Sequence, residues 1–184
     1  AAITGLVNQA SGVITNVANL YFSPFFTQGH GIYNLTGGSI YIGAGGITVF
    51  AGGGYEMNVG GGTIAAEAPW SSSLNISLTG INGPGTFDTA GNAITLSGTL
   101  SGSGGLTKIG NGTLDLSGVN TYSGHTTVNA GTLQLDVSGA SSSALRIVDG
   151  ATLNLSYGGT LTVPAFSTNG IALPSGVYTA ANLP

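Results

Sequence analysis

The sequence predicts an all-β protein, a parallel β-solenoid of about seven or eight rungs with irregular N- and C-terminal caps. Three observations support this fold class. A phrase of an apolar residue, a Gly-rich step, a small residue and an aliphatic residue recurs about every 20 to 30 residues, which is typical of stacked arrays. Apolar and polar residues alternate after each copy, as in half-buried strands. Gly contributes 34 of the 184 residues, which suits a chain with many tight corners.

Six copies of the phrase define the rungs. They occupy residues 35–40, 59–64, 89–94, 109–114, 128–133 and 148–153. Each copy reads as a strand, a tight turn containing Gly or Asn, and a second strand. We therefore predict that the six closing aliphatic residues form one column of the core: Ile40, Ile64, Ile94, Leu114, Leu133 and Leu153.

Stacking is what buries the apolar side of these units. A single two-stranded unit is not stable alone, but rungs spaced about 4.8 Å apart bury a continuous core. A second column is predicted six positions before the first, with Asn34 and Asn58 in an amide ladder. In that column Asp88 and Lys108 fall on adjacent rungs, and we expect them to pair as a structural contact worth about 0–1 kcal/mol if exposed.

The chain is predicted to be a single domain, residues 1–184. Residues 1–30 form an irregular N-terminal segment or first rung, residues 31–163 the repeat rungs, and residues 164–184 a C-terminal cap. The cap is indicated by residues that interrupt regular strand pairing: Pro164, Pro174 and Pro184.

The N-terminal segment permits two interpretations. Residues 11–14 resemble a first copy of the phrase, although Asn16 then falls on an expected core position. The apolar spacing also fits a helix. Gly5, Gly12 and the β-branched residues disfavour that helix, so a strand is the preferred prediction.

Composition excludes several classes of function. Lys plus Arg total 2 and Asp plus Glu total 6, so no basic patch for nucleic acid can form. No apolar run approaches the roughly 18 residues that span a bilayer, and we expect no membrane insertion. The chain has no Cys, so disulfides play no part. An uncharged surface rich in Thr, Asn and Gly favours a secreted or cell-surface location, with any signal peptide removed.

Catalytic and metal-binding patterns are weak. The chain has two His residues, and His125 lies near Asp115 in sequence, but no G-x-S-x-G elbow accompanies them. Among the six carboxylates only Glu67 and Asp136 share a predicted column, three rungs apart, which does not suit glycoside hydrolysis. We therefore expect no enzyme activity, no cofactor and no metal. A polysaccharide lyase or hydrolase is the weakest alternative.

Aromatic residues offer a possible sugar-binding face. Tyr21 and Trp70 are the test residues for such a face. The competing interpretation, which we favour, places Phe22, Phe26 and Trp70 in the core of long rungs.

The residues from Leu100 to Leu133 carry a resemblance to a known family. Residues 100–108, 112–118, 120–124 and 126–133 resemble the autotransporter-associated β-strand repeat, also called the passenger-associated transport repeat. This resemblance implies a right-handed β-helix at a bacterial surface and supplies no catalytic residues. Residues 32–99 and 145–183 look more loosely like the flanking rungs of such proteins.

A solenoid has two open ends, and charge is the usual protection of such edges. Because this chain is nearly uncharged, we expect a structural subunit that assembles end to end with itself into an extracellular filament or stalk, or that lends a strand to a neighbour. The predicted assembly residues are Ile3, Leu6, Val7, Val13, Ile14, Val17, Leu20, Phe22, Ile171, Leu173, Val177 and Tyr178. The alternative is an adhesin-type module that binds cells or surface glycans.

Overall fold

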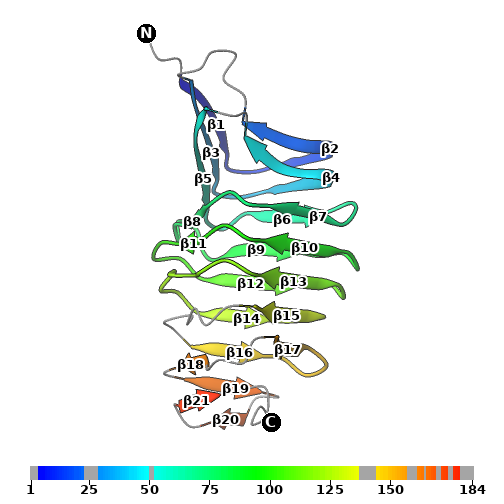
Figure 1. The fold of residues 1–184 in the computed structure, drawn as a ribbon, viewed down its shortest axis with the longest axis vertical. Coiled ribbons are helices and arrows are strands. Elements are labelled where there is room, and N and C mark those ends of the chain that lie inside the picture. The colour runs from blue at the N-terminus through cyan, green and yellow to red at the C-terminus, as the bar shows by residue number, and fades with distance from the viewer. Residues whose placement is uncertain are drawn as a thin grey trace.

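A computed structural model describes residues 4–22, 29–49, 52–136, 144–156, 161–163, 165–168, 171–173 and 176–178. Every regular element in these residues is a β-strand. The chain winds into a parallel β-solenoid with its first strands at one end of the stack and its last strands at the other (Figure 1). The predicted fold class is therefore confirmed.

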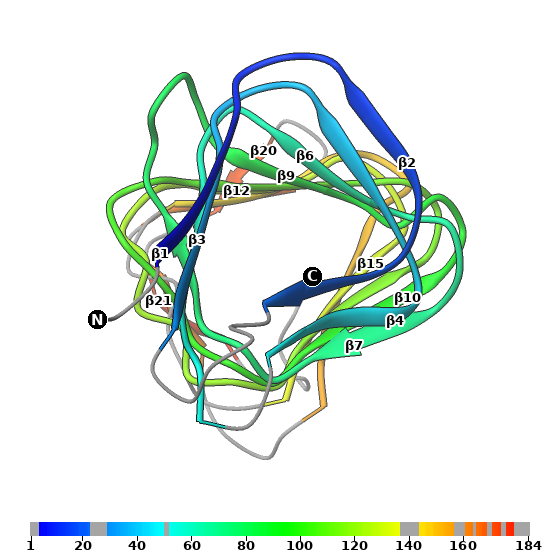
Figure 2. The ribbon, with the colours of Figure 1, turned by 90° about the horizontal axis from the view of Figure 1, so that it is seen from above.

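Three sheets form the walls of the solenoid (Figure 2). Sheet A contains β1 (Thr4–Gln9), β3 (His30–Leu35), β5 (Gly54–Val59), β8 (Ile76–Leu78) and β11 (Leu100–Ser101). Sheet C contains β7 (Trp70–Ser72), β10 (Ala93–Leu96), β13 (Thr113–Leu116), β15 (Thr132–Leu135) and β17 (Thr152–Leu155).

Sheet B extends along the whole stack. It contains β2 (Val13–Phe22), β4 (Ser39–Val49), β6 (Thr63–Ala66), β9 (Gly85–Asp88), β12 (Leu106–Ile109), β14 (Thr126–Val128), β16 (Leu145–Ile147), β19 (Phe166–Thr168) and β20 (Ile171–Leu173). The last pair, β19 with β20, is antiparallel. A separate antiparallel pair joins β18 (Leu161–Val163) to β21 (Gly176–Tyr178).

The solenoid makes about six turns, slightly fewer than the predicted seven or eight. Two features explain the difference. The first turns are long, since Asn8, Asn34 and Asn58 stack although 26 and then 24 residues separate them. The last strands pair antiparallel rather than adding parallel rungs.

The single predicted column of six aliphatic residues is wrong. Ile40 pairs with Ile64 in sheet B, whereas Ile94 and Leu114 pair in sheet C, on the same column as Trp70. The phrase marks a corner of the solenoid, and two different corners use it. Residues 35–40 and 59–64 turn from sheet A into sheet B, and the four later copies turn from sheet B into sheet C.

The core lies between the three sheets. It consists of the inward-facing residues of each strand, such as Leu35, Ile64, Phe87 and Leu114, which are fully buried. Trp70 is also in the core, at 4% exposure, as the packing interpretation predicts. Burying a large apolar side chain contributes about 1.5–3 kcal/mol relative to leaving it exposed.

The N-terminal segment is a pair of strands, not a helix. The pairing of β2 with β4 is irregular: Ile14 lies opposite Ile40, but Val17 lies opposite Ile42. This bulge places one extra residue in β2, so Val17 rather than Asn16 takes the column position. The polar residue that the sequence placed in the core is therefore passed over by the register.

Candidate functional site: the first rung and the polar columns

The first rung, formed by β1 and β2, is the outermost described rung at the N-terminal end of the stack. Within the described residues β1 pairs only with β3, and β2 only with β4. Each strand therefore presents one unpaired backbone edge, and Figure 1 shows both at the end of the solenoid. Strand edges of this kind are templates for pairing with a further strand.

Apolar side chains are exposed on this rung. Leu6 and Val13 point away from the interior columns and are 58% and 63% exposed. Val7 and Ile14 continue interior columns, in register with Tyr33 and Ile40, yet they are 47% and 39% exposed. Val7 and Ile14 are exposed because none of the described strands covers them.

One polar residue partly closes the end of the core. Gln9 takes the interior position in register with Leu35, and it is only 6% exposed. Its Nε2 donates to the carbonyl of Ser39 at 3.0 Å, and its Oε1 accepts from the Tyr33 hydroxyl at 2.6 Å. A buried amide with both ends bonded avoids the cost of an unpaired polar group. Sequence reasoning did not identify Gln9.

The other predicted assembly residues are divided between surface and core. Val17 and Leu20 are partly buried against the core, and Phe22 is 6% exposed and packs near Tyr55 with ring centroids 5.9 Å apart. Phe22 is therefore a core residue of its own chain. Tyr21, by contrast, is 46% exposed.

At the C-terminal end, Ile171 is 65% exposed on β20. The backbones of Leu173, Val177 and Tyr178 pair with Phe166, Thr162 and Leu161. Ile3 lies outside the described residues. The structure thus places Leu6, Val7, Val13 and Ile14 together at one end, and Ile171 at the other.

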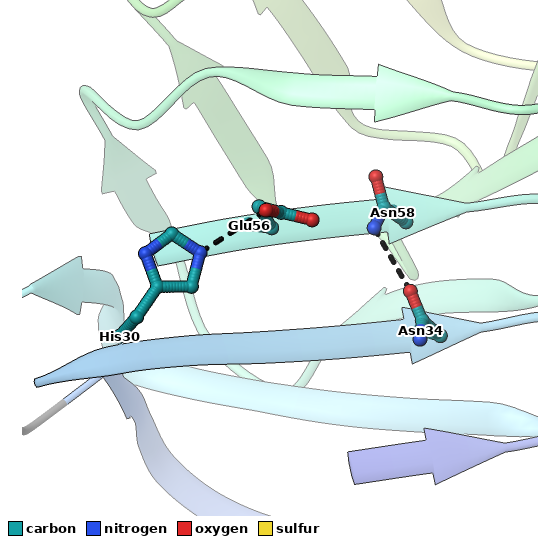
Figure 3. Close-up of polar contacts among 4 residues, drawn as sticks. All are labelled: His30, Asn34, Glu56 and Asn58. Atoms are coloured by element: carbon teal, nitrogen blue, oxygen red, sulfur yellow. Dashed lines mark hydrogen bonds and ion pairs between the residues drawn. The ribbon is translucent and has the colours of Figure 1, made fainter. Parts of the chain in front are cut away.

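The predicted amide contact between Asn34 and Asn58 is present (Figure 3), and the ladder extends to Asn8. Asn58 Nδ2 donates to Asn34 Oδ1 at 2.8 Å, and Asn34 Nδ2 donates to Asn8 Oδ1 at the same distance. The column continues in register to Ser77 and Ser101. Beside the ladder, His30 Nε2 and Glu56 Oε1 lie 3.1 Å apart on adjacent strands.

Asp88 and Lys108 do not belong to this ladder, and their predicted alignment on adjacent rungs of it is wrong. Both residues are in sheet B, where Lys108 lies opposite Phe87 rather than Asp88. Lys108 is completely buried, on an interior column between Phe87 and Val128. The error arises because corners of different length shift the register between rungs.

The Lys108 ammonium group is enclosed by acceptors. Its Nζ donates to the carbonyls of Ile109, Gly110 and Ala130 at 3.1, 2.7 and 3.0 Å, and to the Thr89 hydroxyl at 3.0 Å. These groups belong to the corners of three consecutive turns. Burial lowers the pKa of Lys108 to about 8, and the nearby Asp88 carboxylate opposes this shift. Lys108 therefore ties adjacent corners together from inside.

Two carboxylates approach each other on the outer face of sheet C. Burial and the neighbouring Asp136 carboxylate raise the pKa of Asp115 above its usual value. Gln134 and Asn154 continue the Asp115 column, with Asn154 Nδ2 donating to Gln134 Oε1 at 3.1 Å. Sequence alignment placed Asp115 and Asp136 in different columns. A diagonal contact between rungs brings them together.

The described residues contain no group of three or more His, Cys, Asp or Glu side chains that could hold a metal ion. In the same part of the chain, no helix has the length and apolar character needed to cross a membrane.

Comparison with known proteins identifies the repeat. Residues 106–135 match the family model Passenger-associated-transport-repeat, which confirms the resemblance found in the sequence. A stretch of 60 residues, or 33% of the chain, is 52% identical to the Adhesin BmaC autotransporter of Brucella suis biovar 1 (strain 1330). That stretch spans 2% of the length of the adhesin. No solved structure matches the chain.

Proposed function

We propose that this chain is a non-catalytic stalk segment of a bacterial surface adhesin, and that its first rung stacks end to end on a further copy. The passenger-associated repeat and the similarity to an autotransporter adhesin support a cell-surface or extracellular role of the adhesin type. A parallel solenoid suits a stalk because each rung contacts only its neighbours and the stack extends in one direction.

The observation that carries end-to-end stacking is the exposed interior of the first rung. Val7 and Ile14 lie on columns that are buried in the next turn by Tyr33 and Ile40. A further rung placed on β1 and β2 would bury them and satisfy both backbone edges. Contact between different ends of two copies is heterologous, so it extends into an open filament.

The competing mode of assembly is strand lending. In this structure β1 and β2 are paired along their length within their own chain. Lending β1 or β2 to a neighbour would break this existing pairing. We therefore favour stacking of a further copy on the intact rung.

Sedimentation velocity and negative-stain microscopy across a concentration series test stacking. We expect the wild-type rods to lengthen with concentration. The double variant Val7→Lys with Ile14→Lys should remain as single rods, because stacking would bury two charges. Val119→Lys is the matched control, since Val119 is 59% exposed in the middle of the stack. Single rods at all concentrations would exclude stacking, as would elongation that survives the double variant.

The adhesin role is tested separately. Beads coated with the protein should attach to host cells more than beads coated with albumin, and equal attachment would contradict the role. Screening against pectins and other polysaccharides should show no turnover, because the passenger-associated repeat and the adhesin relative support a non-enzymatic role.

A further inference from the structure

The long turns of the solenoid meet the short turns on sheet A, and a step forms where they meet. β5 has six residues, whereas β8 has three. The two strands pair only at Asn58 with Ser77 and at Val59 with Leu78. The first part of β5, from Gly54 to Met57, therefore projects beyond its neighbour as a ledge, and Figure 1 shows β5 extending past β8.

A groove of about 380 Å³ lies under this ledge. We call it the sheet A groove. It crosses three strands, β5, β8 and β11, and at about 4.8 Å per strand it is roughly 10 Å long. Its volume falls within the range of small-ligand sites. The polar and aromatic residues that line it are Tyr55, Glu56, Asn58, Asn75, Ser77 and Ser101.

One wall of the groove presents hydrogen-bond acceptors. The amide ladder runs in one direction, so Asn58 uses its Nδ2 on Asn34 and its Oδ1 accepts no hydrogen bond from a described residue. Figure 3 shows this oxygen pointing away from Asn34, toward the side where the ladder ends. Glu56 uses Oε1 on His30, and its side chain is 53% exposed. Its second carboxylate oxygen is unoccupied by the described residues.

The rest of the groove supplies donors and hydroxyls. Asn75 accepts from the Thr99 backbone N–H through Oδ1, and its backbone N–H donates to the Tyr55 hydroxyl, both at 2.8 Å. These contacts hold the Asn75 side chain so that Nδ2 remains available. Among the described residues the hydroxyls of Ser77 and Ser101 make no hydrogen bond, and they follow Asn58 along the same column.

We propose that the sheet A groove binds an uncharged sugar of a surface glycan. A sugar hydroxyl donates and accepts at once, so vicinal hydroxyls match a wall of planar acceptors that faces amide and hydroxyl donors. Glu56 is the one charged residue that lines the groove, so a carboxylated or sulfated sugar is repelled. A single carboxylate also supplies too few oxygens for a divalent cation, since Ca²⁺ takes about six to eight oxygen ligands.

This inference rests on the adhesin part of the proposed function and names its ligand class. The test uses the full chain on an array of uncharged oligosaccharides built from glucose, galactose, mannose and their N-acetylated amino sugars. Titration calorimetry with the best-bound oligosaccharide then gives the affinity. We expect saturable binding that Glu56→Gln and Asn58→Ala each weaken at least tenfold. The first variant removes charge-assisted hydrogen bonds to the Glu56 carboxylate, and the second removes those to the Asn58 amide oxygen.

Asn8→Ala is the matched control. It removes the opposite end of the same amide ladder, away from the groove, and should leave the affinity unchanged. Thermal melts of all three variants establish that each is folded. No binding on the array, or binding that survives both groove variants, would overturn the assignment. Beads that attach to cells although the array is silent would remove the groove assignment and leave the adhesin role intact.

Discussion

The long N-terminal turns and the short repeat turns of this solenoid differ in the side chains that join one rung to the next. In the long turns the rungs are joined outside, by the ladder of Asn8, Asn34 and Asn58. In the repeat turns they are joined inside, where Lys108 donates to corner carbonyls of adjacent rungs.

The difference shows what a tight corner requires. A short turn with positive-φ Gly, such as Gly110 at φ 78 and Gly131 at φ 65, directs some backbone carbonyls inward. Buried carbonyls must be paired, and one long side chain with three N–H groups can serve several of them. The first long turn uses a shorter internal donor, the Gln9 amide, whose Nε2 donates to the carbonyls of Gly12 and Ser39.

Removal of the internal donor should have the largest effect. Lys108→Met keeps the length and apolar character of the side chain but leaves the carbonyls of Gly110 and Ala130 unpaired. We expect a loss of about 3 kcal/mol in the free energy of unfolding, measured by urea denaturation. Thr107→Val, on the outer face of the same strand, is the control and should change it by less than about 1 kcal/mol. A Lys108→Met protein as stable as the wild type would show that the corners do not depend on this donor.

Corner glycines separate backbone strain from crowding between rungs. A Cβ on Gly131 would lie 2.4 Å from the Gly112 carbonyl oxygen, whereas a Cβ on Gly150 has nothing within 4 Å. Both residues have positive φ. Gly150→Ala should cost about 1–2 kcal/mol from its backbone conformation alone, and Gly131→Ala clearly more. Equal losses in thermal or urea unfolding would mean that crowding adds nothing.

The pH dependence of stability should differ between the two regions as well. The pKa of Lys108 is lowered to about 8 in the folded protein from 10.5. Between these values the unfolded chain binds more protons, so stability rises as pH increases from about 8 toward 10.5. Thermal melts at pH 8 and pH 10 should show this rise, and Lys108→Met should not. A rise that persists in Lys108→Met would assign it to another group.

The smallest expected effect concerns the outer face of sheet C. Asp115→Asn removes one of two neighbouring carboxylates and extends the amide column of Gln134 and Asn154. Since Asp115 has a raised pKa, its charged form is disfavoured by folding. The variant should therefore be more stable at pH 7 by about 0.5–1 kcal/mol in the free energy of unfolding, measured by urea denaturation. Asp149→Asn, at an exposed carboxylate, is the control and should leave this free energy unchanged. A destabilised Asp115→Asn protein would mean that the charge itself contributes to the fold.

Much of the fold follows from local patterns. Alternation identified strands such as β13 and β15, and equal spacing predicted that Asn34 and Asn58 would stack. What failed was the assignment of Ile40 and Ile94 to one column, because the two corners of the solenoid need the same Gly-containing phrase. A pattern of period two specifies which residues face inward but not which sheet they belong to.

The register between rungs was the second feature that the sequence pattern could not predict. Phe87, Lys108 and Val128 share a column, and their partners in the next sheet are Ile94, Leu114 and Leu133. Over these three turns the corner becomes shorter by one residue at each step. Because one residue of slip reverses inside and outside, the sequence placed Lys108 in the column of Asn34 and Asn58 when it lies on an interior column of sheet B. The sequence pattern did not predict Gln9 or the sheet A groove for a related reason. Both depend on how turns of different length fit together.

The sequence by itself determined that this chain is a sparsely charged, repetitive, all-β stack, and that residues 106–135 carry the passenger-associated transport repeat. Composition and period are local properties, and they do not depend on how rungs align. The tertiary structure alone decided that Lys108 is internal, that the first rung exposes Val7 and Ile14, and that a polar groove lies beneath β5. Each of these depends on register between rungs, which is set by corner lengths and packing rather than by the pattern of any one rung.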